Sequence, residues 1–236
     1  MRVICGVAAV LLAAATPQIA EAQTVDCAVV KCVALTFDDG PAAPTDRLLD
    51  VLTANGADAT FFLIGDKVAA DPAAAARIAA AGMEIGNHTW SHPDLTAIPT
   101  DQIAGQLTRT TDAIVAATGQ RPTLMRPGFG TVDDRVLAEA GRQGLAVVNW
   151  DVVPYDWIHD RDIAASRAIL MSRVRPGSVV LLHDIFDSTV DLVEQFLPVL
   201  RANGYHVVSV GQLLGPRAPG TLYGGVENGP AVNALR

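Results

Sequence analysis

The chain has 236 residues, a mass of 24.7 kDa and a formal net charge of −8 at pH 7. This length suits one domain, whose core is large enough to fold without a structural metal. Half of the residues are apolar and 18% are charged, which excludes an intrinsically disordered chain. A pI near 5.0 argues against nucleic acid and anionic lipid as partners, and we expect a monomer.

The N-terminus has the pattern of a cleaved export signal. Arg2 precedes an apolar, alanine-rich run over residues 3–16, and an A-x-A cleavage site follows at residues 20–22. A buried N-terminal helix is the alternative interpretation. We predict a signal peptide over residues 1–22, a secreted or cell-envelope protein, and no further membrane span.

Cleavage at this site would leave two cysteines, Cys27 and Cys32. An even pair in an exported chain indicates a disulfide that closes a small loop. Two free thiols are the alternative.

Apolar runs and amphipathic segments alternate seven times along the rest of the chain. This order predicts an α/β protein with a mostly parallel sheet and right-handed crossovers. Seven units without a linker fit a closed or nearly closed barrel, with an open doubly wound sheet as the alternative. The last residues, rich in Gly and Pro, are predicted to form a surface tail. The expected strands span residues 32–37, 60–64, 83–86, 124–125, 145–150, 178–182 and 206–210. The expected helices span residues 45–54 (capped by Thr45), 72–81, 100–118, 132–143, 162–174 and 190–202.

Polar side chains follow directly after the predicted strands. The string TFDDGP ends the first strand, and NHTWSHP follows the third. RPGFG follows the fourth strand, Asp151 and then Asp156-Trp157 follow the fifth, and His-Asp follows the sixth. Because the carboxyl ends of parallel strands meet on one rim, these side chains are predicted to form one site. Trp150 is interpreted as a core residue rather than as part of that site.

Two histidines on this rim are four residues apart. Since Pro93 disfavours a helix at His92, we place His88 and His92 in a turn-like loop. Two neutral imidazoles and one carboxylate are a common ligand set for a hydrolytic zinc ion. The neighbours Asp38 and Asp39 project differently, so one can bind the metal while the other faces a water. The alternatives are two structural histidines and a solvated acidic turn.

These strings resemble the polysaccharide deacetylases of the NodB-homology type, carbohydrate esterase family four. TFDDGP and HTWSHP are long and specific, and the other strand-end strings match the remaining family motifs in the expected order. The resemblance covers about residues 33–214. It implies a distorted (β/α)7 barrel, in agreement with the seven predicted units. The expected division is a catalytic domain over residues 23–214 and a tail over residues 215–236.

The resemblance also implies roles for individual residues. It places a divalent metal, Zn²⁺ before Co²⁺ or another ion, on Asp39, His88 and His92. It places the general base on Asp38 and the arginine that pairs with this base on Arg126. The other matches are the general acid His183, its orienting partner Asp156, the pocket residues Trp157 and Leu181, and Phe129, whose backbone N–H would help form an oxyanion hole.

Two positions depart from the family pattern. Phe129 stands where the family usually has Tyr, and a backbone donor survives that change. Gly128 replaces a frequent Pro, which would loosen the loop.

The implied activity is removal of acetyl groups from N-acetylglucosamine-containing glycans, which include peptidoglycan, chitin and chito-oligosaccharides. An acetylxylan esterase would use the same site. An alternative of another class is an inactive scaffold that binds carbohydrate, but the complete set of five acidic and histidine residues argues against it.

Overall fold

The computed structural model describes residues 25–160, 162–227 and 235. The predicted signal peptide, residues 1–22, lies outside these residues. Within the described part of the chain, no helix has both the length and the hydropathy of a membrane-spanning segment.

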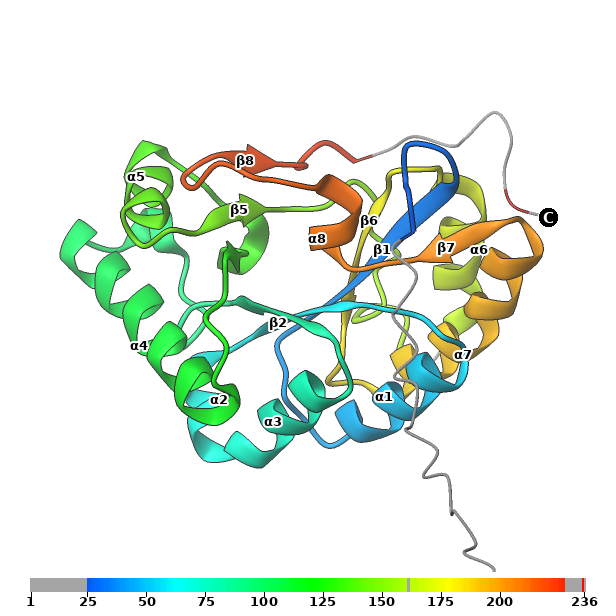
Figure 1. The fold of residues 1–236 in the computed structure, drawn as a ribbon, viewed down its shortest axis with the longest axis horizontal. Helices are drawn as coiled ribbons and strands as arrows, with labels where there is room; N and C mark the ends of the chain where they lie inside the picture. Colours follow the sequence, from blue (N-terminus) through cyan, green and yellow to red (C-terminus); the bar gives the residue numbers. More distant parts are fainter. Residues whose placement is uncertain (1–24, 161, 228–234, 236) are drawn as a thin grey trace, which may run out of the picture.

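The strands form a curled parallel sheet in the order β6-β1-β2-β3-β4-β5-β8, and β7 pairs with the first residues of β1 (Figure 1). Val152, which follows β5, forms a single parallel β-bridge with Val180 of β6. The barrel is therefore not closed at this point by a continuous ladder of backbone hydrogen bonds. The structure is thus a distorted (β/α)7 barrel in a single domain, which confirms the predicted fold class. The strands are β1 (Lys31–Asp38), β2 (Thr60–Leu63), β3 (Glu84–Asn87), β4 (Leu124–Met125), β5 (Ala146–Val148), β6 (Val179–His183), β7 (Tyr205–Val207) and β8 (Leu222–Tyr223).

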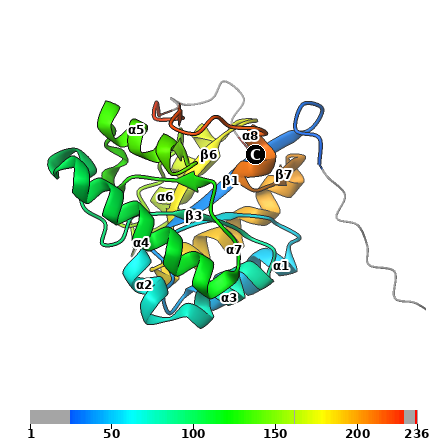
Figure 2. The ribbon, with the colours of Figure 1, turned by 60° about the vertical axis from the view of Figure 1, so that its left-hand side comes forward.

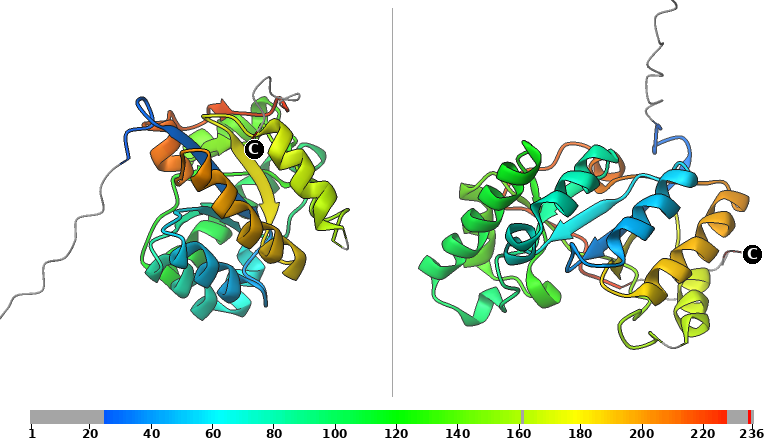
Figure 3. Two further views of the ribbon diagram at one scale, coloured as in Figure 1. Left: turned by 90° about the vertical axis from the view of Figure 1, so that its right-hand side faces the viewer. Right: turned by 90° about the horizontal axis from the view of Figure 1, so that it is seen from below.

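The helices pack around the outside of the sheet. The short helices α2 and α3 lie beside the long helix α4 (Figure 2). On the side of β7, α6 and α7 pack against each other (Figure 3). The α-helices are α1 (Thr45–Ala54), α2 (Gly65–Ala70), α3 (Pro72–Ala80), α4 (Thr100–Thr118), α5 (Asp134–Arg142), α6 (Ile163–Arg173), α7 (Asp187–Ala202) and α8 (Val210–Leu214), and the 3₁₀ turns are η1 (Leu95–Ala97) and η2 (Gly128–Gly130).

β1 passes through the middle of the sheet and is buried on both faces. Only its first residue, Lys31, is exposed. Burial on both faces is typical of a parallel sheet that is covered by helices. Cys27 and Cys32 form the predicted disulfide, which ties the preceding loop to the start of β1. The tied end of the strand is therefore opposite to the end that carries Asp38.

The register of the sheet brings the polar strand ends together. Asp38 at the end of β1 lies opposite His183 at the end of β6. Asn87 at the end of β3 lies opposite Met125 at the end of β4. Because these strands are parallel, the loops that follow them start from one rim of the barrel.

Two helical details differ from the sequence prediction. Pro44, not Thr45, occupies the N-cap of α1. The hydroxyl of Thr45 instead accepts a hydrogen bond from the Ala42 N–H at 2.9 Å and donates one to Asp184 at 2.5 Å. The sequence also does not predict α2, because six residues that begin with Gly65 are too few to show helical periodicity.

The segment predicted as a surface tail takes part in the sheet. β8 pairs with β5, with Leu222 opposite Val147. The Gly225 N–H then donates to the Trp150 carbonyl oxygen at 2.8 Å. These contacts use backbone atoms, which leave no side-chain pattern in a sequence rich in Gly and Pro.

Candidate active site

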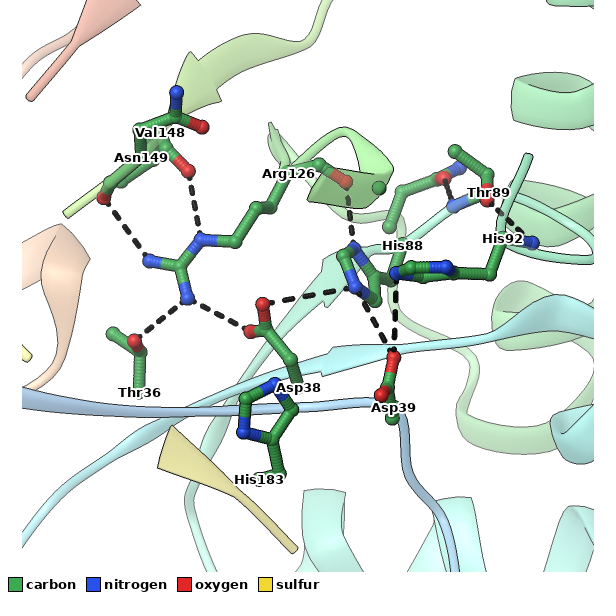
Figure 4. Close-up of polar contacts among 12 residues, drawn as sticks. Thr36, Asp38, Asp39, His88, Thr89, His92, Arg126, Val148, Asn149 and His183 are labelled. Carbon is green, nitrogen blue, oxygen red and sulfur yellow. Dashed lines mark hydrogen bonds and ion pairs between the residues drawn. The ribbon is translucent and has the colours of Figure 1, made fainter. Parts of the chain in front are cut away.

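Asp39, His88 and His92 converge on the rim formed by the strand ends (Figure 4). Nε2 of His88 lies 3.4 Å, and Nε2 of His92 3.6 Å, from Oδ1 of Asp39. Nδ1 of His88 lies 2.7 Å from the Arg126 carbonyl oxygen, to which it donates its hydrogen. This tautomer leaves the lone pair of Nε2 directed toward Asp39.

The protonation states of Asp39 and His92 fit a divalent cation. Oδ1 of Asp39 is buried and accepts no hydrogen bond, so a cation would satisfy it. Burial acts to raise the pKa of Asp39, but its interactions with the imidazoles of His88, His92 and His183 lower it to about 2. Burial, together with the neighbouring imidazole of His88, lowers the pKa of His92. A carboxylate and neutral imidazoles are the forms that bind Zn²⁺.

The loop between the two histidines is held by polar contacts that the sequence analysis did not identify. The Asn87 side chain accepts a hydrogen bond from the Thr89 N–H at 2.9 Å and donates one to the Leu107 carbonyl oxygen of α4 at 2.8 Å. The hydroxyl of Thr89 accepts the His92 N–H at 3.0 Å. The His-x3-His pair thus lies in a hydrogen-bonded loop, as predicted, and not in a helix.

Asp38 is fixed by Arg126, whose guanidinium group is completely buried. Nη1 donates to Oδ1 of Asp38 and to the hydroxyl of Thr36, both at 2.8 Å. Nε and Nη2 donate to two carbonyl oxygens at the end of β5, at 2.9 and 3.1 Å (Figure 4). These four hydrogen bonds offset the cost of burying the ion pair and orient the carboxylate. The other oxygen of Asp38 lies 3.6 Å from Nε2 of His88.

His183 faces this group from the neighbouring strand end. Its Nδ1 lies 3.0 Å from Oδ1 of Asp156, and its backbone N–H donates to Oδ2 at 2.8 Å. The hydroxyl of Thr189 donates to the same Oδ2 at 2.8 Å. Burial acts to lower the pKa of His183, but the hydrogen bond and charge of Asp156 outweigh it and raise the pKa. The protonated imidazole is thereby favoured.

A cavity of about 430 Å³ opens between these groups. The ring of Trp157 lies against that of His183, with centroids 5.0 Å apart, and Leu181 is buried in the wall. Phe129 is 68% exposed, and its ring lies 4.8 Å from that of His92. Trp150 also lines the cavity, so its interpretation as a core residue is wrong. The complete lining is Asp38, Asp39, His88, His92, Pro127, Phe129, Trp150, Trp157, Leu181, His183, Ile185 and Phe186.

The backbone is strained around this cavity. Within the described residues, five non-glycine residues have a positive φ, and all of them lie in the rim loops. Such conformations cost free energy and often occur at functional sites. The five residues are Asp39, Thr89, His92, Phe129 and Tyr155.

A second hollow, of about 490 Å³, lies at the opposite end of the barrel around β7. It has a similar volume, but its lining includes a single histidine, His206, and a single carboxylate, Asp58. The rim cavity therefore remains the better candidate for the active site.

Residues 26–148 match the family model described as polysaccharide deacetylase. The chain is 38% identical over 184 residues to the peptidoglycan-N-acetylmuramic acid deacetylase PdaC of Bacillus subtilis, covering 78% of this chain and 38% of that protein. It is 35% identical over 207 residues to a chitooligosaccharide deacetylase of Bradyrhizobium, covering 80% of this chain and 93% of the relative. The chain thus spans about two fifths of the length of PdaC but nearly all of the Bradyrhizobium protein.

A solved structure of a T48 deacetylase with substrate superposes with a TM-score of 0.80 and 38% identity, over 85% of this chain and all of that one. The fold, the order of the strand-end strings and these matches lead to one conclusion. The chain belongs to the polysaccharide deacetylase family, the NodB-homology type of carbohydrate esterase family four.

Proposed function

We propose that this protein is a secreted, metal-dependent deacetylase that hydrolyses the N-acetyl groups of N-acetylglucosamine-containing glycans and releases acetate. One observation carries the proposal: an ion-paired carboxylate and a histidine with a raised pKa face the same group of three metal-ligand candidates. Amide hydrolysis needs these opposite proton states at once, since a base must activate water and an acid must protonate the leaving amine.

Asp39, His88 and His92 would hold the cation, with Zn²⁺ as the first candidate. When bound, such an ion activates water and polarises the acetyl carbonyl group. The buried Oδ1 of Asp39, which accepts no hydrogen bond, supports this assignment.

Asp38 takes the proton from the attacking water, because Arg126 orients its carboxylate toward the histidine pair. The backbone N–H of Phe129 donates to the oxyanion that develops on the acetyl oxygen. Phe129 lines the cavity, and its ring lies 4.8 Å from that of His92, which supports this role. His183 then gives its proton to the departing amine nitrogen, and Asp156 stabilises the imidazolium before that step.

The cavity wall supports an acetylated sugar as the substrate. Leu181 and Trp157 offer an apolar surface beside His183, which suits the acetyl methyl group. The exposed rings of Phe129 and Trp157 suit the apolar face of a pyranose ring. The names of the relatives, deacetylases of peptidoglycan and of chito-oligosaccharides, support the same class of substrate.

Export is the second part of this proposal. The predicted signal peptide and the Cys27–Cys32 disulfide both fit an oxidising compartment outside the cytoplasm. Intact-mass analysis of the protein from the culture medium would test it, with residue 23 expected as the first residue.

Acetate release from chito-oligosaccharides, peptidoglycan and acetylxylan, measured side by side, tests the activity. We expect the N-acetylated substrates to react faster than acetylxylan. His183→Ala should remove the N-deacetylase activity, because an amine nitrogen that is not protonated leaves far less readily than an alkoxide. His206→Ala is the matched control, since this exposed histidine lies in β7 at the far end of the barrel. Clear preference for xylan that persists in His183→Ala would favour the esterase. Binding of sugar oligomers without acetate release would favour an inactive scaffold.

A further inference from the structure

A buried carboxyl group that takes no part in the proposed reaction lies beneath the turn that carries Asp38 and Asp39. Asp184 is completely buried, and burial raises its pKa to about 7. Its Oδ2 accepts the hydroxyl hydrogen of Thr45 at 2.5 Å. Its Oδ1 has no hydrogen-bond partner, and among the described residues no ion pair involves this group. Burying such a group is costly, so a contribution to stability alone does not account for it.

The carboxyl group of Asp184 is packed directly against the turn. A Cβ atom added to Gly40 would lie 2.2 Å from Oδ2 and 2.4 Å from Oδ1 of Asp184, so only glycine allows this approach. The backbone N–H of Asp184 also donates to the Asp38 carbonyl oxygen at 3.3 Å. Asp184, the residue directly after β6, thus contacts the turn with both its backbone and its side chain.

Thr45 connects this carboxyl group to the far side of the same turn. Its hydroxyl donates to Asp184 and accepts the Ala42 N–H at 2.9 Å. A third element reaches the turn from α2, where Nζ of Lys67 donates to the Asp39 carbonyl oxygen at 2.7 Å. Residues 38–42 are therefore held by three hydrogen bonds, one each to Asp184 after β6, Thr45 of α1 and Lys67 of α2.

We propose that Thr45 and Asp184 are positioning residues that brace the Asp38–Ala42 turn and so set the affinity of the Asp39, His88 and His92 site for its divalent ion. This inference rests on the proposed metal site. Asp39 holds a φ of +73°, which the turn must maintain against the residue's own preference. A brace beneath the turn fixes the direction of the Asp39 carboxylate relative to the two imidazoles.

The test compares Thr45→Val, which keeps the shape but removes the hydroxyl, with Thr45→Ser, which keeps the hydroxyl. Thr60→Val is the matched control. Thr60 is also fully buried, donates to a carboxylate (Glu84, 2.8 Å) and accepts a backbone N–H (Val210, 2.9 Å), but at the opposite end of the barrel. Zinc affinity is measured by competition with a chromophoric chelator, and the thermal midpoint of the metal-free protein is measured in parallel.

We expect Thr45→Val to weaken zinc binding about tenfold or more, the size typical of residues that support metal ligands. Thr45→Ser should restore wild-type affinity. Thr60→Val should lower the thermal midpoint while leaving zinc affinity unchanged. Equal zinc affinities in wild type, Thr45→Val and Thr60→Val would overturn the brace. A wild-type protein that binds no divalent ion would instead refute the metal site itself.

A second variant covers the case in which Thr45→Val does not fold. Gly40→Ala forces a methyl group against the Asp184 carboxyl group, which must move away from the turn, and Gly105→Ala in α4 is its control because a Cβ there meets no atom within 4 Å. We expect weaker zinc binding in Gly40→Ala only. Wild-type affinity in Gly40→Ala would contradict the proposal.

Discussion

The hydrogen bond between Asp156 and His183 allows a sharp test of the proposed general acid. In Asp156→Asn the side chain keeps its size, and one oxygen can still accept a hydrogen bond, but the negative charge is lost. The charges of Asp38 and Asp39 still raise the pKa of the His183 imidazole, but burial loses its main opponent and the pKa falls. A larger fraction of the enzyme therefore has a neutral His183, which cannot protonate the leaving amine.

The size of the effect follows from the contacts. The bond between Nδ1 of His183 and Oδ1 of Asp156 joins two charged groups, and such bonds contribute about 1.5–3 kcal/mol. Loss of that amount from the transition state corresponds to a roughly 10- to 100-fold lower kcat near neutral pH. The pKa of His183 is raised above the usual histidine value of 6.5 in the wild type, so the alkaline limb of the pH profile should lie above pH 6.5. In Asp156→Asn this alkaline limb should move to lower pH.

The assay is acetate release from a chito-oligosaccharide as a function of pH, with zinc content determined for each variant. Asp162→Asn is the matched control. It removes an exposed carboxylate near the same loop, and the side chain of Asp162 makes no helix-capping hydrogen bond. We expect the control to have the wild-type profile. An Asp156→Asn variant with wild-type kcat and an unshifted alkaline limb would refute the role assigned to Asp156.

Three further predictions concern the metal, the buried arginine and the disulfide. Chelation should abolish acetate release while the circular dichroism spectrum stays unchanged. Added zinc should restore acetate release in the wild type but not in His88→Ala. Activity that survives complete metal removal would contradict metal dependence. Arg126→Lys should lower the free energy of unfolding by about 2–6 kcal/mol in urea titrations, because at least two of its four acceptors lose their partner at about 1–3 kcal/mol each; an unchanged midpoint would refute the estimate. Reduction of Cys27–Cys32 should lower the free energy of unfolding by roughly 2 kcal/mol, as expected for a small loop. It should not change kcat, since the loop lies at the far end of β1 from the site. Loss of activity in the folded, reduced protein would contradict this prediction.

The sequence predicted the order of strands and helices because each unit carries its own apolar pattern. It also placed the chemistry on one rim, because that follows from parallel strands without any knowledge of side-chain contacts. The strings around Asp38 and His88 were identifiable as site candidates because several polar residues follow directly after an apolar strand.

The supporting hydroxyl groups were beyond prediction from the sequence. Thr36, Thr89 and Thr189 each make one specific hydrogen bond at the site, but a threonine has the same local pattern in a strand, a loop or a helix. Thr45 was interpreted as a helix cap because it begins the segment with helical periodicity. Its actual partner, Asp184, lies 139 residues away in the chain, so only the fold reveals the contact.

That the C-terminal segment joins the sheet could not be predicted from the sequence, for a different reason. β8 has two residues and joins the sheet through backbone hydrogen bonds to β5. Its neighbours Gly224 and Gly225 have positive φ values and pass close to Asn149 and Trp150, so the glycines that suggest a free tail in fact permit close packing.

The variant Asp38→Asn tests the central claim most directly, since it separates metal binding from proton transfer. Asn keeps the shape of the side chain and a hydrogen-bond acceptor for Arg126, but it cannot take the proton of the attacking water. We predict one zinc ion per chain in both proteins, bound to the Asp39, His88 and His92 site, and a kcat on a chito-oligosaccharide reduced by about 10²- to 10⁴-fold in Asp38→Asn. A zinc-loaded Asp38→Asn protein that releases acetate at the wild-type rate would contradict the account.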